Sequence, residues 1–147
     1  MDIMPGFTLT DIETSGARIR LRHGGSGPPL LLLHGNPLSH VSWHAVAPKL
    51  AERFHVVAAD LRGYGDSSAP PEEPGSVNYS FRAMAQDQVE VMRALGHQRF
   101  FVAGHDRGGR TTHRMCLDHP DKVIKAAIID IVPTLEIGRA SCRERVC

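Results

Sequence analysis

The amino-acid sequence predicts an α/β fold in which helices cover both faces of a mostly parallel β-sheet. Two observations support this prediction. Short apolar runs of strand length alternate with segments of helical periodicity, as in residues 99–103, 107–118 and 123–129. Several of these runs end in glycine-rich or acidic turns, where sheets of this kind bind ligands. The 147 residues, 41% hydrophobic and 22% charged, suffice for one such core.

The first part of the chain reads as a hairpin followed by a buried strand. Residues 7–13 and 17–22 alternate apolar and polar side chains around the turn at Ser15 and Gly16, which is typical of two antiparallel strands. The run Leu30–Leu33, bounded by turn residues, predicts a strand buried on both faces.

Helical spacing and turn residues place the next elements. Apolar side chains predict a helix over Trp43–Arg53, and Val56–Ala59 predicts the following strand. After a loop rich in Gly, Pro and Ser, Ser80 is the expected N-cap of a helix over Phe81–Leu95, which Gly96 ends.

The segment GHDRG, residues 104–108, follows the predicted strand 99–103 and precedes a predicted helix. This is the pattern of a nucleophile elbow, a strained turn that lifts one side chain above the sheet, with Asp106 at the nucleophile position. A carboxylate at the end of a buried strand is costly unless it has a function. We therefore interpret Asp106 as a catalytic nucleophile.

Together with LLLLHGNP and DLRGYGDS upstream and DIVPT downstream, this elbow resembles the α/β-hydrolases, and more closely the haloacetate (fluoroacetate) dehalogenases, over residues 5–135. The resemblance implies an α/β-hydrolase fold and hydrolysis of the carbon–halogen bond of a small haloacid. The chemistry accounts for the aspartate, because a carboxylate that displaces a halide leaves an ester, which water can hydrolyse. The backbone N–H groups of Asn36 and Arg107 are the expected oxyanion-hole donors.

Arg107 and Arg110 lie on the first turn of the helix after Asp106, where the helix dipole also favours anions. The resemblance implies that both bind the carboxylate of the haloacid, which suits the two-pronged geometry of arginine. The alternative is that Arg110 is a surface residue and that Arg107 pairs with a nearby acid.

The resemblance also places the catalytic acid in the DIVPT segment, at Asp130, with a base histidine still further along the chain. All nine histidines lie at or before His119. We therefore expect residues 1–135 to be the N-terminal part of an α/β-hydrolase domain, truncated before its cap and C-terminal strands. A parent protein about twice as long would supply the base, and the chain alone would be inactive.

We expect the other polar residues near the predicted strand ends to have structural roles and not catalytic ones. We expect His34 to support its loop by hydrogen bonding and His105 to pack beneath the elbow. Structural roles without chemistry are also expected for His40, Trp43, His44, Asp60 and Asp66.

Three alternatives stay open at this point. An epoxide hydrolase uses the same aspartyl-ester chemistry, although such relatives usually carry Trp where Arg107 stands. In haloalkane dehalogenases, an asparagine at the position of Asn36 contributes to halide binding. A non-catalytic binding protein on a hydrolase scaffold is the third alternative, but it would have no need of Asp106 together with Asp130.

Composition excludes other classes of partner. The formal net charge is only +1 and there is no long basic run, so we expect no nucleic-acid partner. The longest apolar run, Leu30–Leu33, is too short to span a membrane, and no secretory signal is recognisable, which favours the cytoplasm. We expect no cofactor and no metal, and the parent protein could form a homodimer.

The last twelve residues, 136–147, differ from the rest of the chain. They are polar and arginine-rich, contain Cys142 and Cys147, and have neither helical nor strand periodicity. They resemble the in-frame translation of a DNA sequencing adapter. We therefore interpret them as a non-native tail and leave them out of the fold prediction.

Overall fold

The computed structural model describes residues 1–132 and 145–146. Within these residues one seven-stranded sheet has the order β1-β2-β4-β3-β5-β6-β7. Its strands are β1 (Thr8–Glu13), β2 (Arg18–Gly24), β3 (Pro29–Leu33), β4 (His55–Ala59), β5 (Phe100–His105), β6 (Val123–Ile129) and β7 (Arg145–Val146). The helical elements are η1 (His40–Trp43), α1 (Ala47–Leu50), η2 (Pro74–Tyr79), α2 (Phe81–Ala94) and α3 (Arg107–Asp118).

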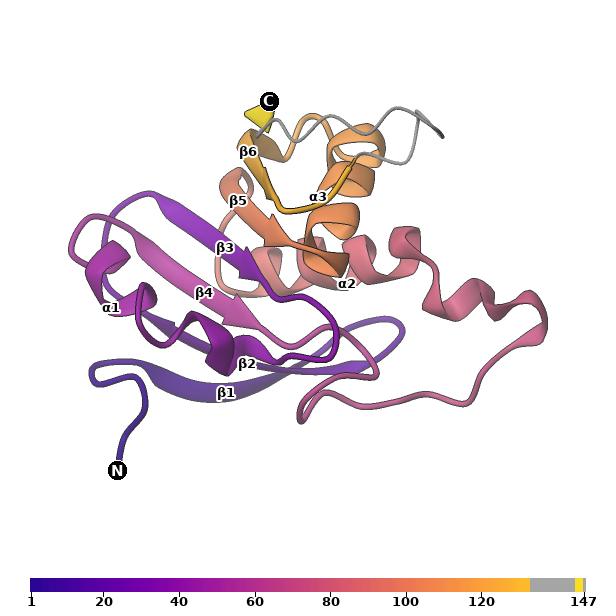
Figure 1. Cartoon of the computed structure of the whole chain (residues 1–147), viewed down its shortest axis with the longest axis horizontal. Helices are drawn as coiled ribbons and strands as arrows, with labels where there is room; N and C mark the ends of the chain where they lie inside the picture. The colour runs from indigo at the N-terminus through magenta and orange to yellow at the C-terminus, as the bar shows by residue number, and fades with distance from the viewer. Residues whose placement is uncertain (133–144, 147) are drawn as a thin grey trace.

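Strand directions confirm the predicted mostly parallel sheet (Figure 1). β4, β3, β5 and β6 run parallel to one another. The hairpin of β1 and β2 joins the edge of β4 in the antiparallel direction. The carboxyl ends of the parallel strands therefore lie along one edge of the sheet, which is where ligands bind in such folds.

The apolar run of β3 packs on both faces of the sheet, because successive side chains of a strand point to opposite sides. Leu31 and Leu33 belong to a core cluster that also contains residues of α2 and α3. Leu30 and Leu32 belong to a second cluster with Met4 and Ala47, the first residue of α1. Helices thus cover both faces, and β3 lies at the centre of the core (Figure 1).

The predicted helix over residues 43–53 is wrong. The structure instead has the 3₁₀ turn η1, which ends at Trp43, and the single helical turn α1, which begins at Ala47. Pro48 is the second residue of α1. Because proline lacks a backbone N–H and is tolerated only in the first turn of a helix, no continuous helix can run through it from Trp43. The helix predicted to follow Ser80 is confirmed, and the Ser80 Oγ accepts the Ala83 N–H at 3.2 Å.

A buried ion pair fixes the long loop between β4 and α2. Arg62 donates to both oxygens of Asp87 at 2.6 and 2.7 Å, and both side chains are almost fully buried. The remaining Arg62 nitrogen, Nη1, donates to the carbonyl of Asn78 at 2.7 Å. Thr14 donates to Asp87 at 2.6 Å, so the β1–β2 turn joins the same network. One guanidinium therefore holds the last turn of η2 against the middle of α2.

Most of the tail set aside in the sequence analysis, residues 136–147, lies outside the described residues. Its described part is β7, whose backbone pairs antiparallel with β6 at Ala127 and Ile128. No helix among the described residues is long and apolar enough to cross a membrane.

Three histidines form a chain of contacts at the amino end of the parallel strands. His23 Nδ1 lies 3.0 Å from His55 Nε2, and His55 Nδ1 lies 2.6 Å from His97 Nε2. Burial lowers the pKa of His55, and the positive charges that His97 and His23 would carry lower it further. Burial and His23 lower the pKa of His97 in the same way. The folded chain therefore favours neutral imidazoles at His55 and His97.

We predict that acid destabilises the protein through this histidine chain. The unfolded state keeps a histidine pKa near 6.5 and binds more protons than the folded state below that pH. The contribution to stability is thus complete above pH ~6.5 and is lost as the pH falls through the lower folded values. Urea unfolding of the parent protein between pH 7.5 and 5 measures the slope. His55→Gln should flatten it, whereas His44→Gln, at an exposed position, should not; equal slopes in both variants would contradict the prediction.

Candidate active site

Asp106 occupies a strained turn between β5 and α3. Its φ of 53° and ψ of −115° lie outside the regions that L-amino acids favour. Backbone hydrogen bonds hold this conformation from both sides: Asp106 N–H donates to the Ile129 carbonyl at 3.2 Å, and the Asp106 carbonyl accepts Arg110 N–H at 3.0 Å. The turn thus presents the aspartate at the carboxyl edge of the sheet, as the elbow pattern predicts.

The glycines on each side of Asp106 are required by close packing. A Cβ at Gly104 would lie 2.2 Å from the carbonyl oxygen of Gly108, and a Cβ at Gly108 would lie 2.2 Å from that of Leu33. Both distances are far below van der Waals contact. The start of α3 therefore lies directly on the ends of β5 and β3, which explains the spacing of the two glycines in the sequence.

Backbone N–H groups stabilise the charged form of the Asp106 carboxylate. The N–H of Asn36 donates to Oδ2 at 3.0 Å. This hydrogen bond is the largest cause that lowers the pKa of Asp106, and the Arg107 backbone and guanidinium act in the same direction, against partial burial. The N–H of Asn36, one of the two predicted oxyanion-hole donors, thus bonds to this carboxylate.

The loop that carries Asn36 is supported by His34. His34 is fully buried, its Nδ1 lies 2.9 Å from the Gly35 carbonyl, and its Nε2 accepts the N–H of Leu61 at 3.0 Å. Burial lowers the pKa of His34, so it stays neutral and acts as a structural residue. The expected role of His34 in supporting the loop is confirmed by these contacts.

Asp60 is a second buried support of the same loop. Its Oδ1 accepts from the N–H of His40 at 2.7 Å and from His40 Nδ1 at 2.8 Å, and its Oδ2 accepts the Asp66 N–H at 2.9 Å. Arg22 contacts the other His40 nitrogen at 2.5 Å. Burial alone would raise the pKa of Asp60, but the bonds from His40 and Asp66 outweigh burial and lower it. The polar side-chain atoms of Asp60 and His40 all have partners within this network, in agreement with the structural roles expected for the two residues.

Asp106, Arg107 and Arg110 line a common cavity of about 430 Å³, together with Asn36, Tyr79, Ser80 and Phe81. Arg107 is exposed and Arg110 is half-buried. Within residues 1–132 and 145–146, neither guanidinium forms an ion pair with a carboxylate. The cavity thus offers an anion two cationic side chains beside the ionised Asp106.

Asp130 follows β6 at the same edge of the sheet. β5 and β6 pair in parallel with His105 opposite Ile129, so the next residues, Asp106 and Asp130, end neighbouring strands. Asp130 has a φ of 55°, and its carboxylate is 87% exposed. The position expected for His105 beneath the elbow is wrong: its side chain is 35% exposed, and its Nε2 lies 3.7 Å from Asp130 Oδ2. Alternation along β5 explains this, because Gly104 occupies the buried face and His105 the other.

Tyr79, Ser80 and Phe81 also line the cavity, and none of them is predicted from the sequence as a site residue. Only the helix cap at Ser80 gives a sequence signal, and it concerns helix structure rather than binding. Among the described residues, no group of three or more His, Cys, Asp or Glu side chains is arranged to hold a metal ion.

Comparison with known proteins gives consistent matches. A family model described as "alpha/beta hydrolase fold" matches residues 28–140. A fluoroacetate dehalogenase from Burkholderia sp. is 57% identical over 129 residues, which are 88% of this chain and 42% of the relative. A soluble epoxide hydrolase from Corynebacterium sp. (strain C12) is 41% identical over 82% of this chain and 41% of its own length. The crystal structure of a protein described as an α/β hydrolase from Nostoc sp. PCC 7120 aligns with a TM-score of 0.86 and 59% identity, over 87% of this chain and 44% of that one. The chain thus spans less than half the length of these proteins.

Gly35 provides a test of the site geometry. A Cβ at this position would lie 2.7 Å from the Cβ of Asp106 and 2.8 Å from His105 Nδ1. We predict that Gly35→Ala lowers the free energy of unfolding of the parent protein by about 1–3 kcal/mol and displaces Asp106. Urea unfolding and a crystal structure of the variant measure both effects. Leu38→Ala, at an exposed position in the same loop, should stay within about 0.5 kcal/mol of the wild type; an equally stable Gly35→Ala protein would refute the prediction.

Proposed function

The chain belongs to the α/β-hydrolase fold family, and from this premise we propose that its parent protein hydrolyses the carbon–halogen bond of a small haloacid, such as fluoroacetate, to give glycolate. The observation that carries the proposal is the ionised Asp106 on a strained turn, with two arginines on the following helical turn. The similarity to a fluoroacetate dehalogenase supports the same substrate class.

In the first proposed step, Asp106 attacks the carbon that bears the halogen. The Asn36 N–H holds Oδ2, so Oδ1 is the oxygen available for attack. A carbon–oxygen bond forms, the carbon–halogen bond breaks, and the halide leaves with the bonding electron pair. The lowered pKa of Asp106 keeps the nucleophile in its reactive, charged form.

In the second proposed step, water attacks the Cγ carbon of the Asp106 ester. Negative charge develops on Oδ2, which accepts the Asn36 N–H, and we assign the Arg107 N–H as the second donor to this oxygen. The intermediate collapses, the bond between Cγ and the substrate oxygen breaks, and the carboxylate of Asp106 is regenerated; the leaving oxygen takes up the proton removed from the water, which gives the hydroxy acid. A base must remove a proton from the water, and we assign that role to a histidine of the parent protein outside this chain, oriented by Asp130.

Arg107 and Arg110 account for the choice of an acid as substrate. Both line the Asp106 cavity from the first turn of α3, where the helix dipole also attracts anions. A carboxylate held by both guanidinium groups would place its α-carbon against Asp106.

We propose no cofactor or metal, because the carboxylate nucleophile and water supply every bond that the reaction forms. We propose no nucleic-acid or membrane partner. We place the parent protein in the cytoplasm and propose that its oligomeric state be tested for a homodimer.

An epoxide hydrolase is the second candidate, favoured by the similarity to the soluble enzyme of Corynebacterium sp.. It would form the same Asp106 ester by opening an epoxide ring. The two cationic side chains beside Asp106 favour the haloacid, since a neutral epoxide has no carboxylate for them to bind. A neutral haloalkane also lacks a carboxylate for the two arginines, so a haloalkane dehalogenase is less favoured for the same reason. A protein that only binds ligands would gain nothing from the strained conformation of Asp106.

Isotope labelling tests the nucleophile. We predict that single-turnover hydrolysis of chloroacetate by the parent protein in oxygen-18 water places the label in Asp106, as measured by mass spectrometry of the peptide. Asp106→Asn should lower kcat by about 10⁴-fold or more, because the amide cannot form the ester. Label found only in the product would remove Asp106 from this role.

Substrate comparison tests the arginine pair. Arg110→Lys should lower kcat/KM for chloroacetate by about 10- to 100-fold, since a point charge replaces a planar, two-pronged donor. The wild type should release halide from chloroacetate and not from neutral 1-chloropropane. Arg93→Lys, remote from the cavity on α2, is the matched control and should retain the wild-type rate. Equal rates on the acid and the haloalkane would contradict binding of a carboxylate.

A further inference from the structure

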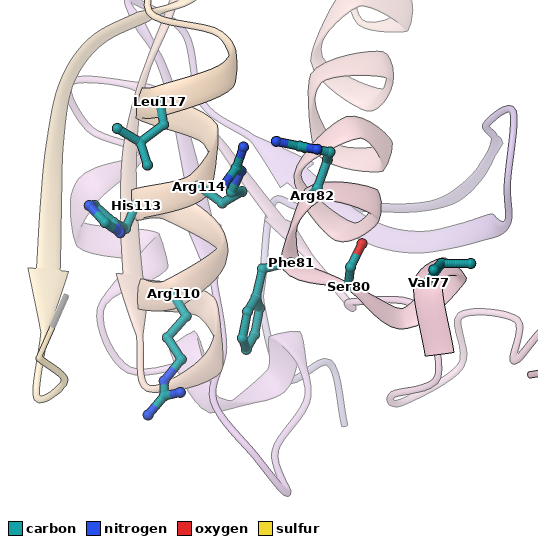
Figure 2. Close-up of a pocket in the computed structure, with 8 residues that line it drawn as sticks. All are labelled: Val77, Ser80, Phe81, Arg82, Arg110, His113, Arg114 and Leu117. Carbon is teal, nitrogen blue, oxygen red and sulfur yellow. The ribbon is translucent and has the colours of Figure 1, made fainter. Parts of the chain in front are cut away.

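A second cavity adjoins the Asp106 cavity. It has a volume of about 550 Å³ and lies between α3 and the start of α2; we call it the outer groove (Figure 2). Its lining residues are Val77, Ser80, Phe81, Arg82, Arg110, His113, Arg114 and Leu117. Ser80, Phe81 and Arg110 line both cavities, so these three residues form the boundary between them.

Phe81 is the bulkiest apolar residue of this boundary. It is the first residue of α2 and is held there by the Ser80 cap. In Figure 2 its ring points from α2 toward the N-terminal end of α3, beside the Arg110 side chain. That end of α3 is where Asp106 lies. The ring therefore stands between the proposed nucleophile and the outer groove.

The chemistry of the outer groove suits an apolar group attached to an acid. Val77 and Leu117 expose apolar surface to it. Arg82 and Arg114 are both paired with Asp118, at 3.0 and 2.6–2.8 Å, so both guanidinium groups are held by one carboxylate. Arg110, at the boundary, has no such partner within the described residues. An acid bound by Arg110 could thus direct an apolar substituent into the groove.

We infer that Phe81 is a specificity-determining residue that limits the substrate to haloacids without a large substituent on the α-carbon. With the phenyl ring in place, the Asp106 cavity ends at the boundary and accepts acids of the size of a haloacetate. With a small residue at position 81, the two cavities join and an alkyl substituent can lie in the outer groove. This inference rests on the proposed function.

The test compares bromoacetate with 2-bromohexanoate, which share a leaving group and a carboxylate and differ by a butyl chain. In the parent protein, Phe81→Ala should raise the ratio of kcat/KM for 2-bromohexanoate over that for bromoacetate by about tenfold or more. Phe81→Leu, a smaller change that preserves more of the packing, should raise the ratio by less. Circular dichroism melting of both variants checks that they fold.

A second substitution identifies where the butyl chain goes. His113 lies three residues, about one helical turn, beyond Arg110 on α3, and it lines the outer groove but not the Asp106 cavity. In the Phe81→Ala protein, His113→Trp should fill the groove and return the ratio toward the wild-type value. An unchanged ratio in both Phe81 variants, or a gain that His113→Trp leaves intact, would overturn the inference. Wild-type protein that releases no bromide from bromoacetate would instead refute the proposed function.

Discussion

α3 begins so close to the ends of β3 and β5 that no Cβ fits between the helix and the sheet at Gly104 or Gly108. This contact forces the chain to turn within one residue, and Asp106 takes the positive φ that such a turn needs. The same contact fixes where the rest of the site can lie. The Asn36 N–H reaches Asp106 because its loop continues from β3, the strand on which α3 rests. Arg107 and Arg110 face the cavity because the helix starts at that edge.

Two sets of charged groups near the carboxyl edge of the sheet differ in how they are paired. Asp60, His40, Arg62 and Asp87 are buried, and each forms hydrogen bonds or ion pairs with other side chains or with the backbone. Buried charges are tolerated only when paired in this way, and losing one partner typically costs about 3–5 kcal/mol. Arg107 and Arg110 have no carboxylate partner within the described part of the chain, although they lie beside an ionised aspartate. The buried, paired groups hold the loops in place. Arg107 and Arg110 are not needed for that purpose and can bind a ligand.

Sequence reasoning succeeded where local rules decide the structure. The spacing of Gly104 and Gly108 around Asp106, after an apolar run and before a helical pattern, sufficed to place β5, the turn and α3. The prediction for residues 43–53 is wrong, because Pro48 lacks the N–H that a continuous helix needs there, although the apolar spacing is helical. The wall formed by Tyr79, Ser80 and Phe81 could not be predicted either. Its position depends on the Arg62–Asp87 pair, which joins segments 25 residues apart and leaves no periodic signal in the sequence. The orientation of His105 toward Asp130 likewise depends on the register of β5 and β6.

The order of strands in the sheet has a consequence for synthesis of the chain on the ribosome. β3 lies between β4, which follows it soon in the sequence, and β5, which is made only after the long loop and α2 are complete. The bond between Asn36 and Asp106 closes a separation of 70 residues. Contacts between such distant segments form slowly, because the entropy lost on closing the loop precedes any gain from pairing. Until β5 emerges, one edge of the apolar strand β3 lacks its partner, and a nascent chain at this stage is exposed to aggregation. The centre of the core is therefore among the last parts of this segment to be completed, and chaperone binding would be most useful during that interval of translation.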